Sequence, residues 1–120
     1  MAGTIVADDI QHSTAGSVGT EYVVNGSAKQ WGYFNGITNT INDSFNVSSL
    51  TDNSTGNYSL NFSNNMSNAN YATSWAGTWN RQYARGDANT TSYSRGKNGN
   101  FSASGSDTDH AMHIVVGDLA

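Results

Sequence analysis

The sequence contains no cysteine and no proline among its 120 residues. Without cysteine there is no disulfide framework, no thiol nucleophile and no cysteine-based zinc site, and redox chemistry does not indicate a compartment. No apolar run approaches the roughly 20 residues that a helix needs to cross a bilayer, and the amino end lacks the apolar core of a signal peptide. We therefore expect no membrane insertion.

Cationic residues are also few. The 5 Lys and Arg residues are outnumbered by 9 Asp and Glu residues, which gives a formal net charge of −4. Because affinity for duplex nucleic acid is mostly cationic, we expect no nucleic-acid partner.

Aliphatic residues are scarce, and short polar residues replace them. Leu, Ile, Val and Phe together number 19, whereas the chain has 16 Asn, 16 Ser and 12 Thr. The low net charge and the 6 Tyr, 3 Trp and 4 Phe indicate a chain that folds around a thin, aromatic core. Short polar side chains favour turns and strand surfaces, which excludes a helical bundle or a coiled coil as the first expectation.

Several segments have the two-residue period of a half-buried strand. The clearest is 58–63, where Tyr58, Leu60 and Phe62 alternate with polar residues. The segment 71–75 aligns Tyr71, Thr73 and Trp75 on one face, and 29–34 places Trp31 and Tyr33 on the face opposite Phe34. The segment 110–116 has the same period, with one face made by His110, Met112, Ile114 and Val116 and the other by Ala111, His113 and Val115. The segment 21–24 is also expected to be a strand, because it is β-prone and ends at an Asn-Gly turn pair. A change of phase between Val47 and Leu50 indicates a β-bulge.

Short strands with turns every 8–12 residues predict one antiparallel all-β domain, a sandwich or a barrel. We expect residues 1–20 to form an extended arm or linker and residues 21–120 to form the β-domain. The glycine-rich, aliphatic-poor stretch 76–106 is expected to be a long variable loop region.

Four segments also carry a family resemblance: NGSAKQWGYFNG (25–36), DSFNVSSLTDN (43–53), GNYSLNF (56–62) and NANY (68–71). Together they resemble the C-terminal domain of tailed-bacteriophage tail fibres and tailspikes. VVGD (115–118) is similar to the usual end of that domain. Ser67 departs from the family pattern, which often has proline there, and 76–106 lies outside the resemblance.

The resemblance implies an all-β, jelly-roll-like β-sandwich at the distal end of a fibre in the virion, assembled as a homotrimer and serving host-cell attachment. The scarcity of aliphatic residues independently favours a homotrimer, because subunit contacts would add apolar burial. The hypothesis is non-catalytic binding of a host cell-surface glycan. The alternatives are a trimerisation or capping module without a ligand, and an accessory domain of a depolymerase.

All six candidate glycan-binding residues lie in the expected loop region 76–106. Aromatic rings stack on the apolar faces of sugars, while Arg and Asp pair with hydroxyl or anionic groups. The residues that combine these properties are Trp79, Arg81, Tyr83, Arg85, Asp87 and Tyr93. Trp75 is expected to belong to the core.

No catalytic or metal site is expected. The sequence has no Gly-x-Ser-x-Gly motif, and its carboxylates lie mostly in turn-like stretches. His110 and His113 lie near Asp107 and Asp109, but residues three apart on a strand face opposite sides, so one chain cannot easily use both as ligands. We therefore expect no enzymatic activity, no cofactor and no metal.

Overall fold

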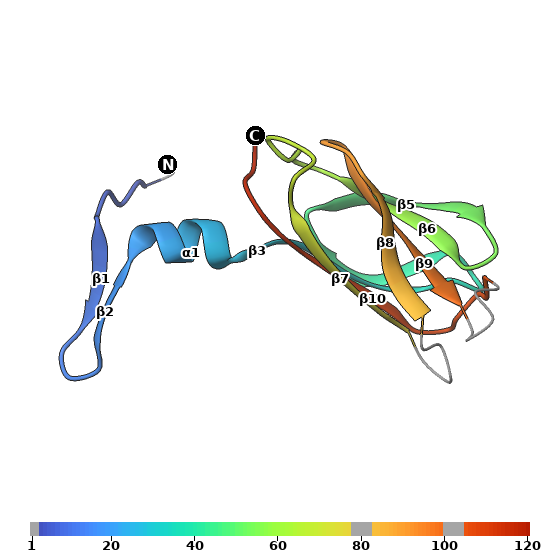
Figure 1. The fold of residues 1–120 in the computed structure, drawn as a ribbon, viewed down its shortest axis with the longest axis horizontal. Helices are drawn as coiled ribbons and strands as arrows, with labels where there is room; N and C mark the ends of the chain where they lie inside the picture. The colour runs from blue at the N-terminus through green and yellow to red at the C-terminus, as the bar shows by residue number, and fades with distance from the viewer. Residues whose placement is uncertain (1–2, 78–82, 100–104) are drawn as a thin grey trace.

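The structure, a computed structural model, describes residues 3–77, 83–99 and 105–120, and for 83–87 the backbone alone. It has two parts, which we call the arm (residues 3–27) and the body (residues 28–120). The arm contains a hairpin of β1 (Asp9–His12) and β2 (Gly16–Gly19), followed by α1 (Thr20–Gly26). Figure 1 shows the arm projecting to one side of the body.

The body consists of two four-stranded antiparallel sheets among the described residues. The first sheet has the order β4-β3-β10-β7 and the second β5-β6-β9-β8. The strands are β3 (Ala28–Asn35), β4 (Thr40–Phe45), β5 (Val47–Ser54), β6 (Asn57–Phe62), β7 (Ala72–Gly77), β8 (Tyr83–Asn89), β9 (Tyr93–Gly99) and β10 (Ala111–Val116). The prediction of an all-β chain is confirmed, with one short helix added.

Aromatic residues from both sheets form the main core cluster. Phe34 and Trp75 of the first sheet pack with Tyr58 and Leu60 of the second, and Ala111 completes the cluster. The ring of Phe34 meets Tyr58 edge-on at a centroid distance of 5.3 Å. A second cluster, nearer the arm, consists of Phe62, Met66, Tyr71 and Val115. The core is therefore aromatic, as the composition predicts.

The strands with the clearest alternation form as expected. In β6, Tyr58 and Leu60 are fully buried and Phe62 nearly so. In β10, His113 and Val115 are buried while the alternate positions are exposed or half-buried. The expected bulge also occurs, because the register of β5 against β6 shifts between Val47 and Ser49.

The segment 21–24 is not a strand, as the sequence predicted, but part of α1. Two adjacent valines lower helix propensity without forbidding a helix. The C-terminal carbonyls of α1 gain a cationic donor, because Lys29 Nζ donates hydrogen bonds to the carbonyls of Val24 and of Ser27, the latter at 2.8 Å. A positive charge at this position also complements the helix dipole.

The prediction of a long loop over 76–106 is wrong for two segments, because β8 and β9 form a hairpin within it. The side of β9 that faces the core carries Ser94, Gly96 and Asn98, all buried, in place of aliphatic residues. A Cβ at Gly96 would lie 2.3 Å from the indole ring of Trp75, so the ring of Trp75 occupies the space above β9. A core face of this kind has no hydrophobic alternation.

The two ends of the body differ. The arm joins the body at Ala28, and we call this end of the body the arm end. At the opposite end, the far end, Ala111 of β10 is paired with both Phe34 of β3 and Gly77 of β7. Tyr58 of β6 reaches the far end too, since its hydroxyl donates to the carbonyl of Gly36 at 3.1 Å.

Candidate binding surfaces

Some of the predicted glycan-binding residues lie at the far end. Trp79 and Arg81 lie outside the described residues. Tyr83, Arg85 and Asp87 belong to β8, whose backbone forms one edge of the second sheet. Asn57, which precedes Tyr58 at the far end, pairs with Lys97 of β9. Tyr83 pairs with Gly99, two residues further along β9. The first residues of β8 therefore lie at the far end.

Tyr93 is not brought together with Tyr83. Tyr93 starts β9 opposite Asn61, six positions before the residue that pairs with Tyr83. At 3.3 Å per residue this separation is about 20 Å. Tyr93 is half-buried, and its carbonyl accepts a hydrogen bond of 2.8 Å from the hydroxyl of Tyr71. Burial raises the pKa of Tyr71 to about 12, so this hydroxyl remains a donor.

An aromatic pair that the sequence did not predict lies beside the far end. Tyr33 and His110 are stacked, with ring centroids 5.6 Å apart and planes 8° apart, and the Tyr33 hydroxyl is hydrogen-bonded to His110 Nδ1. His110 Nε2 lies 3.8 Å from a carboxylate oxygen of Asp109, and both side chains are about half exposed. The pair presents stacked rings and polar groups to solvent, but it arises from residues 77 positions apart, which no local pattern indicates.

The two histidines of the 110–113 segment occupy different environments, as the strand period predicted. His113 is buried against Trp75, at a ring centroid distance of 4.0 Å, and its Nε2 is hydrogen-bonded to Ser94 Oγ at 3.1 Å. Burial lowers the pKa of His113 to about 3, which keeps the ring neutral near pH 7. Among the described residues, no group of three or more His, Asp or Glu is placed to hold a metal ion.

A hydrogen-bonded carboxylate holds the far end of the body in place. Asp107 Oδ1 accepts hydrogen bonds from the backbone N–H of Gly56, at 2.7 Å, and from the hydroxyl of Tyr58. Burial and this carboxylate raise the pKa of Tyr58 well above its usual value. The far end therefore has a fixed frame beneath any binding residues.

The outer side of the first sheet carries a second surface, which is apolar. Phe45 of β4, Trp31 of β3 and Ile114 of β10 occupy successive register positions across three strands, and we call them the outer row. Their exposed fractions are 52%, 38% and 42%, and Met112 is 45% exposed in the neighbouring row. Large apolar side chains gathered on one face mark interaction sites more often than scattered ones do.

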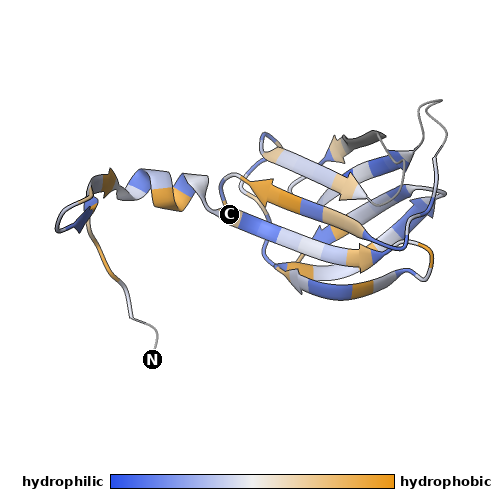
Figure 2. Ribbon diagram, turned by 90° about the horizontal axis from the view of Figure 1, so that it is seen from below, coloured by the Kyte–Doolittle hydropathy of each residue, from blue (hydrophilic) through white to orange (hydrophobic). Residues whose placement is uncertain are grey.

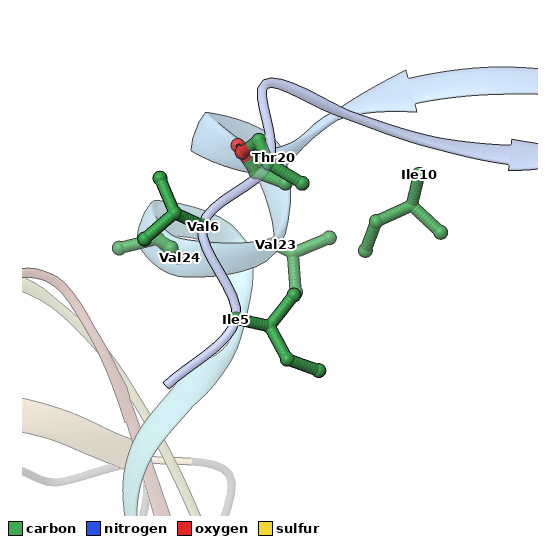
Figure 3. Close-up of a pocket in the computed structure, with 7 residues that line it drawn as sticks. Ile5, Val6, Ile10, Thr20, Val23 and Val24 are labelled. Atoms are coloured by element: carbon green, nitrogen blue, oxygen red, sulfur yellow. Dashed lines mark hydrogen bonds between the residues drawn. The ribbon is translucent and has the colours of Figure 1, made fainter. Parts of the chain in front are cut away.

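The arm is apolar and exposed as well. Its side chains form an open groove of about 410 Å³ between α1 and the segment before β1, lined by Ile5, Val6, Ile10, Val23 and Val24 (Figure 3). Figure 2 shows hydrophobic residues distributed along the arm at a distance from the sheets. The described part of the chain has no helix long and apolar enough to span a membrane.

Comparison with family models, curated proteins and solved structures finds no match for this chain.

Proposed function

We propose that this chain is the tip domain of a phage tail fibre, which binds a host cell-surface glycan without catalysis. In this proposal the two sheets form a β-sandwich, and three copies assemble as a homotrimer at the distal end of the fibre in the virion. The four segments between residues 25 and 71 that resemble tail-fibre C-terminal domains suggest this class.

The connections do not favour the jelly-roll-like order that the resemblance implied. The pairs β3–β4, β5–β6 and β8–β9 are hairpins within one sheet, whereas a jelly roll alternates between its sheets at nearly every connection. The proposal is therefore a two-layer sandwich of hairpins.

The observation that carries the proposal is that the arm joins one end of the body, at Ala28, whereas β7 ends and β8 begins at the other end, the far end. Trp79 and Arg81 lie between these two strands in the sequence. A fibre that continues from the arm would present the far end outward, where Tyr33 and His110 add stacked rings. Binding residues on connections held by a rigid β-scaffold are a usual arrangement for recognition.

The proposed site comprises Trp79, Arg81, Tyr83, Arg85 and Asp87. Tyr93 is left out of it, because Tyr93 lies about 20 Å along the sheet from the residue that pairs with Tyr83. Three such sites on one fibre would increase the overall affinity through effective concentration, even if each site is weak.

The test is binding of the full chain to purified bacterial surface polysaccharides and to the cells that carry them. We expect the Trp79→Ala, Tyr83→Ala double variant to lose at least about tenfold in affinity, because stacked aromatic anchors dominate such sites. Tyr93→Ala, which removes an aromatic ring about 20 Å along the sheet from the far end, is the control and should bind normally. Unchanged binding by the double variant would show that the site is wrong. If the chain binds no polysaccharide while forming trimers, the trimerisation module is the better description.

A further inference from the structure

The arm has more exposed apolar surface than a stable monomer accounts for. Ile5 and Val6 are more than 90% exposed, and Val24 is 61% exposed. A two-stranded hairpin and a helix of seven residues are each marginal in water by themselves. The arm therefore needs a surface to pack on in order to keep this structure.

The total surface area gives the size of the missing contact. The chain exposes 7266 Å², whereas a folded monomer of 12.7 kDa exposes about 6,200 Å². The radius of gyration, 16.6 Å, exceeds the value of about 14 Å for a compact chain of this length. The excess of about 1,000 Å² is close to the 800 Å² or so that each partner contributes to a standard protein interface.

The outer row is an apolar surface whose length matches that of α1. It crosses β4, β3 and β10, which is two inter-strand spacings, or about 10 Å. The seven residues of α1 span about 10 Å as well. Trp, Phe and Met are enriched in protein interfaces, and the outer row with Met112 supplies all three.

The position of the arm explains why the outer row that receives it would belong to another copy of the chain. The arm enters the body at Ala28, three residues before Trp31, so each copy carries its arm next to its own outer row. Figure 1 shows the arm extending away from its own sheets. In a closed ring of copies, each arm can reach the outer row of the next copy while its own row receives another arm.

We propose that the arm of one copy packs on the outer row of a second copy of this chain, with Val23, Val24 and the aliphatic groove around them covering Phe45, Trp31 and Ile114. A large exposed ring of the outer row then fills the groove in Figure 3. This inference rests on the homotrimer of the proposed function, and it names the two surfaces that meet.

Cross-linking of the full chain tests the contact directly, because the sequence has no cysteine of its own. One variant carries Tyr22→Cys on the exposed side of α1, and the other carries Ser74→Cys, which pairs with Ile114 at the end of the outer row. After co-expression and treatment with a short bis-maleimide, we expect mixed products that join one chain of each kind. Ile37→Cys, at the far end, replaces Ser74→Cys in the control and should give none.

Sedimentation of the full chain provides the second measurement. We expect Ile114→Thr to weaken association about tenfold or more, with Ile37→Thr unchanged. Circular dichroism checks that each variant is folded. If Ile114→Thr does not fold, the cross-linking of Tyr22→Cys to Ser74→Cys still tests the contact. Cross-links only between two arms, or none between arm and sheet, would overturn the inference.

The outcomes separate the two proposals. Trimers without arm–sheet cross-links contradict the arm contact alone. Trimers with these cross-links but without polysaccharide binding contradict glycan attachment alone. A chain that sediments as a monomer contradicts both the homotrimer and the arm contact.

Discussion

At the scale of single residues, Asn46 determines how the chain passes from the first sheet to the second. It is the one residue between β4 and β5, and its φ of 56° lies in the left-handed region, which asparagine tolerates better than most residues. Its side-chain amide donates to the carbonyls of Lys29, at 2.9 Å, and Asn64, at 3.1 Å, and its oxygen accepts from the N–H of Asn64 at 2.7 Å.

Replacement of Asn46 tests this role. We expect Asn46→Ala to lower the free energy of unfolding by about 2–4 kcal/mol, because it removes these hydrogen bonds and leaves a Cβ-bearing residue at positive φ. Asn46→Gly loses the same hydrogen bonds but relieves the backbone, so it should cost about 1 kcal/mol less. Urea unfolding monitored by tryptophan fluorescence measures both. Equal losses in the two variants would contradict the argument from φ.

The buried histidine gives a prediction about pH. Burial lowers the pKa of His113 from 6.5 to about 3, so the unfolded state binds its proton more readily. The stabilisation from keeping His113 neutral is therefore present above pH 6.5 and is lost as pH falls toward 3. The contribution to the slope reaches about 1.4 kcal/mol per pH unit.

Comparison with His113→Gln isolates this contribution from that of the carboxylates, which titrate in the same range. We expect the free energy of unfolding of the variant to fall less steeply between pH 6 and pH 4, as measured by urea unfolding at each pH. Identical slopes for the variant and the parent chain would show that His113 is not the group responsible.

At the scale of elements, the packing of β7 on β9 depends on a glycine. A Cβ at Gly96 would lie 2.3 Å from the Trp75 ring, which Phe34 and His113 hold from other sides. We expect Gly96→Ala to lower the free energy of unfolding by about 1–3 kcal/mol through overpacking. Gly26→Ala is the matched control, because a Cβ at the end of α1 meets nothing within 4 Å. Its thermal midpoint should equal or exceed that of the parent chain, and an equal loss in both variants would contradict the packing argument.

The same contact shows which elements the sequence can predict. β6 was predictable because Tyr58 and Leu60 alternate with polar residues along its sequence. β10 was predictable from its two-residue period alone, since apolar residues stand on both of its faces. β9 was not, because Trp75 from another strand supplies the apolar volume that its own Ser94 and Gly96 lack. A pattern within one segment cannot indicate that a distant side chain fills its core face.

At the scale of the whole molecule, the candidate binding surfaces were only partly predictable for a related reason. The sequence placed Trp31 and Tyr33 on one face of a strand, and the structure agrees. It could not indicate that β10 pairs with β3, which places Ile114 beside Trp31 and His110 against Tyr33. These neighbours are more than 75 residues apart, and only the strand order brings them together.

If copies assemble through the outer row, stability depends on protein concentration, because unfolding then also separates the chains. We expect the thermal midpoint of the parent chain to rise by about 2–5 °C for a tenfold increase in concentration, measured by scanning calorimetry. Phe45→Thr places a strand-favouring, β-branched residue on β4 but removes the exposed ring, so its midpoint should depend much less on concentration. Ile37→Thr removes a comparable exposed side chain at the far end and should retain the full dependence. A parent chain whose midpoint is the same at both concentrations is a monomer throughout, and its exposed arm would then need a different partner.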